Sequence, residues 1–520
     1  MEENNVLRLA KPKKKGILSL LFSRFFIIAL LILLQVLLFV AFFDTLKHAA
    51  PFIEVLEPVF LIIVIFYLFN SKMDTSAKLT WLVVLALAPI PGALFLIYCK
   101  RNVGQRSTSF RIKKLLAETK DTIMQNPNVI EDLKDDKSGT KELYHYINRD
   151  GCFPIYENTE VTFFPSGEEK FEAMLVELEK AEKFIYMEYF IIEEGYMWGR
   201  ILDILARKAK AGVDVRVMYD GLCELSTLPS NYPKLLENIG IKAKLFAPIT
   251  PFLSTHYNYR DHRKILVIDG NVGFNGGVNL ADEYINKRER FGHWKDTAIM
   301  LKGAAVQSLT LMFLQMWNVT IKDTDFTQAQ IPAVKAKSDG FVMPYGDSPL
   351  DDDKVGESVY MDILYRAHRY VHIMTPYLIL DGELETALKY AAERGVDVRL
   401  ILPGIPDKDT AYSLAKSHYK NLIASNVKIY EYSPGFVHAK VVVSDDDRAV
   451  VGTINFDYRS LYHHFECATY MYKTSCIADI EADFQTTLTK CAEVTQQTIK
   501  DNKLSRKIKG AILKLLAPLF

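Results

Sequence analysis

The sequence has few cysteines and no net charge, and both shortages narrow the kinds of protein it can encode. Six cysteines are spread over 520 residues without a C-x-x-C pair or zinc-finger spacing, so neither a disulfide framework nor a structural zinc site is expected. Basic and acidic residues both number 63, so no overall field draws the chain to nucleic acid. The sequence also lacks a carboxylate cluster suited to two metal ions and a basic stripe with interleaved aromatics. We therefore expect no metal, no other cofactor and no nucleic-acid partner.

Long apolar runs, in contrast, crowd the first hundred residues. They span residues 25–43, 55–70 and 79–99, and about 20 apolar residues cross a bilayer. The first run is longer than the apolar part of a signal peptide, and no small-residue cleavage site follows it. We therefore predict transmembrane helices within residues 1–100 and a multi-pass protein of the cell membrane. Basic residues flank the runs on both sides, so the positive-inside rule does not decide how many runs cross or which side holds the rest of the chain.

The remaining sequence contains two halves that resemble each other. Each half has a strand-like run, a helical pattern and then the segment GVDVR, at 212–216 in the first half and 395–399 in the second. A repeat of this length indicates a duplicated domain, and the order of elements predicts the α/β class with a mostly buried sheet in each lobe. The expected organisation after the membrane segment 1–100 is a linker or adaptor at 101–150, a first lobe at 151–330, a second lobe at 340–500 and a basic amphipathic tail at 501–520.

Each half also carries one histidine motif with the same internal spacing. The first copy reads HRKILVID from His262 and the second reads HAKVVVSD from His438. In both, lysine follows the histidine by two positions, aspartate by seven, glycine by fourteen and asparagine by seventeen. One such histidine is often only structural, but two complete copies are hard to obtain by chance. The candidate site residues are His262, Lys264, Asp269 and Asn279 in the first half and His438, Lys440, Asp445 and Asn455 in the second.

These residue types suit phosphodiester exchange through a covalent intermediate. Residues two apart on a strand share a face, so each histidine projects together with its lysine. Lysine and asparagine donate hydrogen bonds to anionic oxygens. One histidine can attack phosphorus while the other protonates the leaving alcohol and later deprotonates the incoming one. The two histidines must then be held in opposite protonation states.

The paired motifs resemble those of the phospholipase D superfamily, and the surrounding sequence is similar to that of bacterial cardiolipin synthases. The similar stretches are NYRDHRKILVIDG with GGVNLADEY, GFVHAKVVVSDD with VGTINFDYRS, TPYLILDGEL and LSRKIKGAILKLLAPLF. The resemblance implies two phospholipase D-like lobes related by a pseudo-twofold axis, with the site between them. It also implies that Asp269 and Asp445 are structural partners near the site. Glu466, and further along in its own half Asp296, would support the motif histidines.

The resemblance further implies a membrane-bound phosphatidyltransferase. One phosphatidylglycerol would give its phosphatidyl group to a histidine and release glycerol, and a second would attack to give cardiolipin. His262 is the expected nucleophile and His438 the expected acid and base. A phospholipase D that uses water, a membrane-tethered nuclease and a non-catalytic scaffold are the alternatives, and the oligomeric state stays open. The expected phosphate-binding residues are Lys264, Asn279, Lys440 and Asn455.

The tail 501–520 places apolar residues at helical spacing with lysines and arginine beside them. This pattern predicts a basic amphipathic helix on an anionic membrane surface, with an ordinary packed terminal helix as the alternative. Phosphatidylglycerol and cardiolipin are themselves anionic, so a basic surface would hold the enzyme near both.

Overall fold

A computed structural model describes most of the chain. It covers residues 6–10, six isolated positions between 30 and 45, and residues 52–519 except 101–105, 249–258, 332–335, 337–339 and 351–352.

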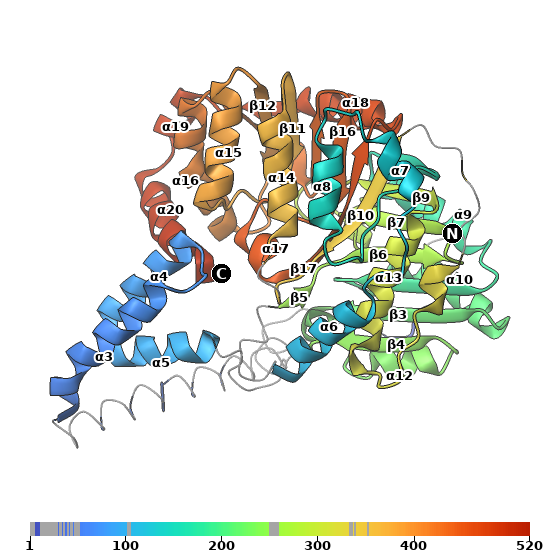
Figure 1. Ribbon diagram of the computed structural model, residues 1–520, viewed down its shortest axis with the longest axis horizontal. Helices are drawn as coiled ribbons and strands as arrows, with labels where there is room; N and C mark the ends of the chain where they lie inside the picture. The colour runs from blue at the N-terminus through green and yellow to red at the C-terminus, as the bar shows by residue number, and fades with distance from the viewer. Residues whose placement is uncertain are drawn as a thin grey trace.

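Two mixed sheets repeat one strand order, as the sequence repeat predicts (Figure 1). The first runs β1-β9-β7-β6-β2-β3-β4 and the second β10-β17-β16-β15-β11-β12-β13, with β18 added at its edge and β5 paired to β17. In each sheet the last three strands of the shared order are parallel. The predicted α/β class with two similar lobes is therefore confirmed.

The strands of the first sheet are β1 (Thr159–Phe164), β2 (Phe184–Tyr189), β3 (Asp214–Asp220), β4 (Lys242–Phe246), β6 (Lys264–Ile268), β7 (Val272–Gly276) and β9 (Ala298–Gly303). Those of the second are β10 (Phe341–Asp347), β11 (Tyr370–Met374), β12 (Asp397–Pro403), β13 (Lys428–Tyr432), β15 (Val441–Ser444), β16 (Arg448–Gly452), β17 (His464–Tyr472) and β18 (Cys491–Glu493). Three short strands join the lobes: β5 (Arg260–Asp261), β8 (His293–Lys295) and β14 (Gly435–Val437).

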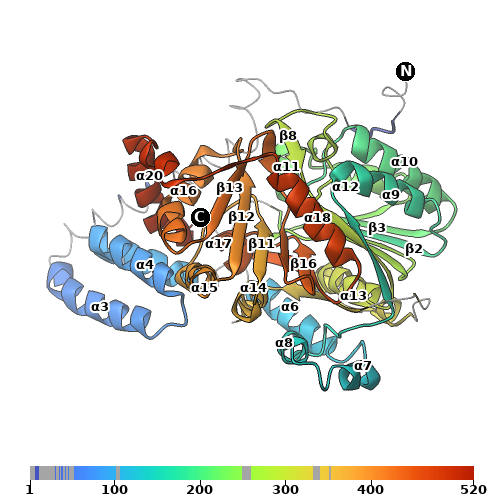
Figure 2. The ribbon, with the colours of Figure 1, turned by 90° about the horizontal axis from the view of Figure 1, so that it is seen from above.

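Two helices fill the space between the sheets, α13 (Val306–Trp317) and α18 (Cys476–Leu488) (Figure 2). α13 follows β9 and contacts β10, the edge strand of the other lobe, and α18 follows β17 and contacts β1 in the same way. Aliphatic side chains from the inner faces of both sheets, such as Ile265 and Val441, join these helices in one buried cluster. The two lobes therefore share a core rather than meeting through a thin contact.

The remaining helices of the lobes are short and amphipathic. The glycine of each GVDVR repeat lies in the left-handed region directly after a helix, with φ of 95° at Gly212 and 94° at Gly395. Glycine is favoured there because a Cβ makes this conformation costly. In the first lobe these helices are α9 (Gly167–Leu178), α10 (Tyr196–Lys210), α11 (Leu222–Ser226), α12 (Tyr232–Glu237), η2 (Asp282–Ile285), η3 (Asn318–Thr320) and η4 (Thr327–Gln330). In the second they are α14 (Val355–Arg366), α15 (Gly382–Glu393), α16 (Asp409–Ala424) and α17 (Tyr458–Tyr462).

The apolar N-terminal segment forms helices that project beside the second lobe (Figures 1 and 2). The run at 55–70 lies in α3 (Phe52–Phe69). The run at 79–99 is not one helix, because Pro89 starts a new one; proline lacks an N–H and disfavours the α conformation of the preceding residue. The result is α4 (Thr75–Leu87) followed by α5 (Pro89–Lys100).

None of the helices that the structure describes combines the length and apolar character needed to cross a bilayer. The predicted multi-pass arrangement therefore finds no support in these helices. The apolar run 25–43 lies outside the described residues except for isolated positions.

The linker segment contacts both lobes. It contains α6 (Arg106–Glu118), which packs on α13 and η3 of the first lobe, and α7 (Pro127–Asp132) and α8 (Thr140–Ile147), which lead along the second lobe. The Thr140 and Tyr470 hydroxyls lie 3.3 Å apart, and the Tyr472 hydroxyl donates to Asp136 at 2.8 Å. The domain boundaries drawn from the sequence stay predictions.

The tail forms α19 (Gln496–Lys500), α20 (Leu504–Leu516) and η5 (Ala517–Leu519), and α20 packs on α16 and α4. Gly510 permits the close approach, since a Cβ there would lie 2.6 Å from the Ser413 carbonyl oxygen. The Thr80 hydroxyl of α4 donates to the Leu515 carbonyl at 2.6 Å. The helix is thus packed along one side, yet Leu504, Ile508 and Ile512 remain exposed on the other.

Candidate active site

His262 lies between β5 and β6 and is held by the opposite lobe. β5 pairs in parallel with the first residues of β17, and the His262 backbone N–H donates to the Phe465 carbonyl at 2.9 Å. The imidazole Nδ1 lies 2.9 Å and 3.0 Å from the two carboxylate oxygens of the next residue, Glu466. A carboxylate of the second lobe therefore orients the histidine of the first.

His438 has the reciprocal arrangement. It follows β14, which pairs in parallel with β8 of the first lobe. Its backbone N–H donates to the Lys295 carbonyl at 2.7 Å, and its Nδ1 lies 2.7 Å from Oδ2 of the next residue, Asp296. The structure thus brings both motif histidines together with the opposite lobe's carboxylate.

Strand register shows that these two carboxylates occupy equivalent positions. Gly276 and Gly452, the glycines of the two motifs, lie opposite Ala298 and Ala468 in their sheets. Asp296 and Glu466 each stand two residues before that alanine. The chain between the glycine and this alanine is six residues longer in the first half, 22 positions against 16, which explains why Asp296 lies further along in the sequence.

Burial favours the neutral form of both imidazoles within the protein. It lowers the pKa of His262 well below its usual value, although Glu466 opposes this. It lowers the pKa of His438 to about 4, with Lys440 adding to the effect and Asp296 opposing it. Burial would raise the pKa of each carboxylate, but the paired histidine holds it below its usual value. An ionised carboxylate accepts the Nδ1–H and leaves the Nε2 lone pair free.

The motif lysines fold back on their histidines. Lys264 Nζ donates to the His262 carbonyl at 2.5 Å. Lys440 Nζ donates to the His438 carbonyl and lies 3.0 Å from its Nδ1. Burial lowers the pKa of Lys264 to about 8 and that of Lys440 to about 7.

A third buried lysine, Lys170, was missed from the sequence. It lies on the apolar face of α9, its Nζ donates to the Val278 carbonyl at 3.2 Å, and burial lowers its pKa to about 7, against the raising effect of Asp296. The available signal was a lysine at a position where the helix periodicity predicts a core residue.

The two asparagines support neighbouring groups. Asn279 accepts from the Ile191 N–H at 3.0 Å and donates to the Tyr284 hydroxyl at 2.7 Å. The Tyr284 ring stands edge-on to the His438 ring, with centroids 5.3 Å apart. Asn455 donates to the Asp457 carboxylate at 3.3 Å. Asn279 therefore positions a tyrosine against the second histidine, a role the motif spacing did not indicate.

The motif aspartates lie away from the histidines, at the far ends of β6 and β15. Asp269 has φ of 54° and accepts three backbone N–H bonds at 2.8 Å from residues 182–184. Asp445 has φ of 56° and does the same for residues 368–370, at 2.7–2.9 Å. Each lies five positions after its lysine along a strand, roughly 16 Å away. They anchor the starts of β2 and β11 and are not part of the histidine cluster.

Aromatic rings and a further histidine close the site. Phe190 packs against His262 and Trp294 against His438, with centroids 4.9 Å and 5.3 Å apart. His464 lies 5.2 Å from His262, and its Nδ1 is 3.4 Å from Glu466 Oε1. Ring nitrogens and carboxylate oxygens of this triplet are close enough to share a metal ion. However, Glu466 already accepts from His262 and from the Thr453 hydroxyl.

The two lobes share one strand order. Each gives a histidine and a lysine to a site that the other lobe's carboxylate orients, and this arrangement defines a phospholipase D-like enzyme. The family described as "Cardiolipin synthase, PLD-like domain" matches residues 174–317 and 360–488. The chain belongs to this family and is a phosphatidyltransferase.

Relatives match nearly the whole length of both proteins. An uncharacterized protein of Streptococcus mutans is 58% identical over 456 residues, which cover 88% of this chain and 99% of the relative. Cardiolipin synthase 2 of Bacillus anthracis is 36% identical, covering 87% and 88%. Cardiolipin synthase of Alkalihalophilus pseudofirmus is 34% identical, covering 89% and 92%.

A solved structure shares the fold at much lower identity. The crystal structure of phosphatidylserine synthase from Haemophilus influenzae superposes with a TM-score of 0.56 at 15% identity. It covers 73% of this chain and 100% of that one.

Proposed function

We propose that this chain makes cardiolipin from two molecules of phosphatidylglycerol, with release of glycerol, through a phosphatidyl-histidine intermediate. The observation that carries the proposal is the reciprocal pairing of His262 with Glu466 and His438 with Asp296 across the two lobes. A two-step transfer needs one nucleophile and one acid on either side of a phosphorus, and two equivalent half-sites supply them. The curated relatives named cardiolipin synthase support cardiolipin as the product.

In the first step the Nε2 of His262 attacks the phosphorus of the donor lipid. The bond from phosphorus to the glycerol oxygen breaks, and that oxygen takes a proton from Nε2 of His438. We assign the nucleophile to His262 because Glu466 faces its Nδ1 with both oxygens and is itself fixed by Thr453. Glu466 thereby holds the imidazole in the tautomer that presents a lone pair at Nε2.

In the second step a glycerol hydroxyl of the acceptor lipid attacks the same phosphorus. His438 takes the hydroxyl proton, the new oxygen–phosphorus bond forms, and the phosphorus–nitrogen bond breaks with its electrons returning to His262. Lys264 and Lys440 stabilise the charge on the non-bridging oxygens in both steps. Since burial favours neutral imidazoles in the protein, we expect the negative phosphodiester to raise the pKa of His438 enough for it to carry the proton.

The test is the full chain in mixed micelles with phosphatidylglycerol. We expect cardiolipin and glycerol in equal amounts. Phosphatidic acid as the main product would show that water is the acceptor. It would refute phosphatidylglycerol as the acceptor. A radiolabelled phosphatidyl group should be trapped on the wild-type chain and on His438→Ala, but not on His262→Ala; the opposite result exchanges the two roles.

A matched control is His372, a buried histidine of β11 whose Nδ1 lies 3.0 Å from Glu481, outside the site. His372→Gln should keep labelling and turnover. If it abolishes both, loss of a buried histidine–carboxylate pair is enough to damage the protein, and the His262 result says nothing about chemistry.

We also propose that the chain works at a membrane. The apolar run 25–43 has the length and composition of a membrane anchor. The exposed apolar stripe of α20 would insert into the interface, while Arg506 and Lys509, which reach Asp409, keep the helix attached to the second lobe.

A further inference from the structure

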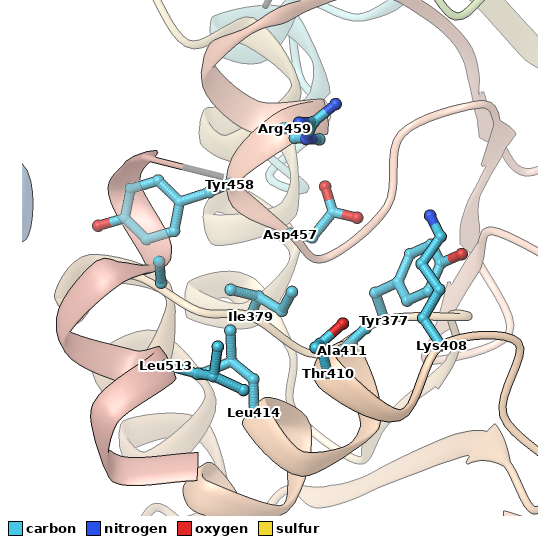
Figure 3. Close-up of a pocket in the computed structure, with 11 residues that line it drawn as sticks. Tyr377, Ile379, Lys408, Thr410, Ala411, Leu414, Asp457, Tyr458, Arg459 and Leu513 are labelled. Carbon is cyan, nitrogen blue, oxygen red and sulfur yellow. The ribbon is translucent and has the colours of Figure 1, made fainter. Parts of the chain in front are cut away.

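A cavity of about 320 Å³ lies beside the second half-site, outside the histidine cluster. It is bounded by α16, by α17 and by the tail helix α20, and Figure 3 shows it with its lining side chains. Ile379, Leu414 and Leu513 form an apolar side in that view, and Arg459 and Lys408 lie on the other side. The cavity therefore has the two-part character of a site for an amphiphile.

The cavity connects to the second motif through short contacts. Asp457, in its wall, accepts from Asn455 of the motif at 3.3 Å and from the Ser460 N–H at 2.8 Å. The ring of Tyr377, also in its wall, lies 6.4 Å from Phe436, whose ring is 5.9 Å from His438. Along this path the rings of Tyr377 and Phe436 stand between the cavity and the proposed acid and base.

The guanidinium of Arg459 forms no hydrogen bond or ion pair within the part of the chain that the structure describes, and Arg459 is exposed at the cavity. The charge of Asp457 attracts it without a direct contact. The nearby Asp457 carboxylate is already engaged by Asn455 and the Ser460 N–H. An arginine left free over an apolar cavity suits a phosphate, which it binds with two parallel N–H bonds.

The proposed reaction brings two phosphates close together, and only one of them is accounted for by the histidines and lysines. The acceptor lipid carries its own phosphate, joined through a single glycerol to the hydroxyl that attacks. We propose that the cavity binds the acceptor phosphatidylglycerol, with its phosphate on Arg459 and the start of an acyl chain against Ile379, Leu414 and Leu513. This rests on the proposed function and deepens it by giving the second lipid its own site.

The size and position of the cavity agree with this occupant. About 320 Å³ is near the lower end of ligand pockets, which run from about 300 to 1,000 Å³. It therefore holds a headgroup and the beginning of a chain, not a whole lipid. The rest of the chain would leave along α20, whose outer face exposes Ile508 and Ile512.

Two reactions of the same enzyme distinguish the function of the acceptor site from that of the histidine cluster. Cardiolipin formation uses an acceptor that bears a phosphate, whereas exchange of labelled free glycerol into phosphatidylglycerol uses one that does not. We expect Arg459→Gln to lower kcat/KM for cardiolipin formation about 10- to 100-fold, mainly through a higher KM for the acceptor, because a charge-assisted phosphate contact is lost. Glycerol exchange should stay within about twofold of wild type, since its acceptor has no phosphate.

The control is Lys420→Gln. Lys420 is an exposed cation on the same helix, α16, about 15 Å along the helix from Thr410 at the cavity. It should leave both reactions unchanged. A second variant, Ala411→Trp, fills the cavity from its wall and should reduce cardiolipin formation while glycerol exchange persists.

Equal loss of both reactions in Arg459→Gln and in Ala411→Trp would overturn the acceptor site, and so would no loss in either. Both of these outcomes are measured as differences between a variant and the wild-type chain. Failure of the proposed function would appear in the wild-type chain itself, as neither glycerol exchange nor cardiolipin in the same micelles.

Discussion

Replacing Asp296 by asparagine should disable the acid and leave the nucleophile intact. Asp296 is fully buried, and its Oδ2 lies 2.7 Å from Nδ1 of His438. An asparagine of the same shape can present an N–H there, which favours the wrong tautomer of His438. Glu466→Gln is the matching change on His262 and should damage the attack on phosphorus instead.

The size of the effect follows from the role assigned to each histidine. General acid catalysis contributes about 10²- to 10⁴-fold, which is about 2.7 to 5.4 kcal/mol of barrier at about 1.36 kcal/mol per tenfold. The equivalent aspartate-to-asparagine change in a Ser–His–Asp triad costs about 10⁴-fold. We therefore expect Asp296→Asn to lower the rate of glycerol release by about 10²- to 10⁴-fold.

The assay compares two donors that differ only in the leaving group. Phosphatidylglycerol releases an alcohol that must be protonated, whereas phosphatidyl-p-nitrophenol releases a phenolate that leaves without a proton. The pre-steady-state burst of nitrophenolate reports the first step alone. With this donor Asp296→Asn should come within about tenfold of the wild-type burst rate, while Glu466→Gln should stay at least about 10²-fold slower.

Rescue of Glu466→Gln in place of Asp296→Asn would reverse the assignment of nucleophile and acid. Rescue of neither would refute the reasoning that an opposite-lobe carboxylate sets the role of each histidine. Far-ultraviolet circular dichroism and thermal unfolding of both variants provide the control for folding.

Three further predictions concern other parts of the molecule. Burial lowers the pKa of Lys440 to about 7, so its proton is lost as pH rises through that value, and kcat/KM should fall above about pH 7. Lys440→Arg should move this alkaline fall in kcat/KM to higher pH, because arginine stays charged. Asp269→Ala should lower the free energy of unfolding by about 2 to 3 kcal/mol in denaturant titrations, since three N–H groups lose a charged acceptor, whereas Asp269→Asn, which tolerates a positive φ, should lose less. Ile508→Asp combined with Ile512→Asp should weaken binding to anionic vesicles by about 10²- to 10⁴-fold, because the two exposed isoleucines together would contribute about 3 to 6 kcal/mol on entering the interface. Cardiolipin formation should therefore slow on vesicles but not in detergent micelles.

The two lobes could be predicted from the sequence because each repeat contains several local patterns that mark its helices and strands. Each GVDVR marks a helix end at a left-handed glycine and the strand that follows, and each histidine motif leads directly into a buried strand. The motif histidines and lysines could be proposed as site residues for the same reason. Their spacing survives duplication and depends on neighbours in the chain.

What the sequence could not provide are the contacts across the lobes. Asp296 and His438 are far apart in the chain and meet only because β14 pairs with β8. Lys170 reaches the site from a helix that carries no motif. The apolar run 79–99 has the length of a membrane span, but hydropathy alone does not show that Pro89 divides it into two shorter helices.

The exchange of carboxylates between lobes also restricts how this chain can diverge. Neither lobe, expressed as two separate copies, would reproduce both half-sites, because one histidine is served by a glutamate and the other by an aspartate. A substitution at Glu466 would therefore act on His262 in the other half, and one at Asp296 would act on His438. Each half keeps the residue that its sibling requires, so neither can change at these positions alone.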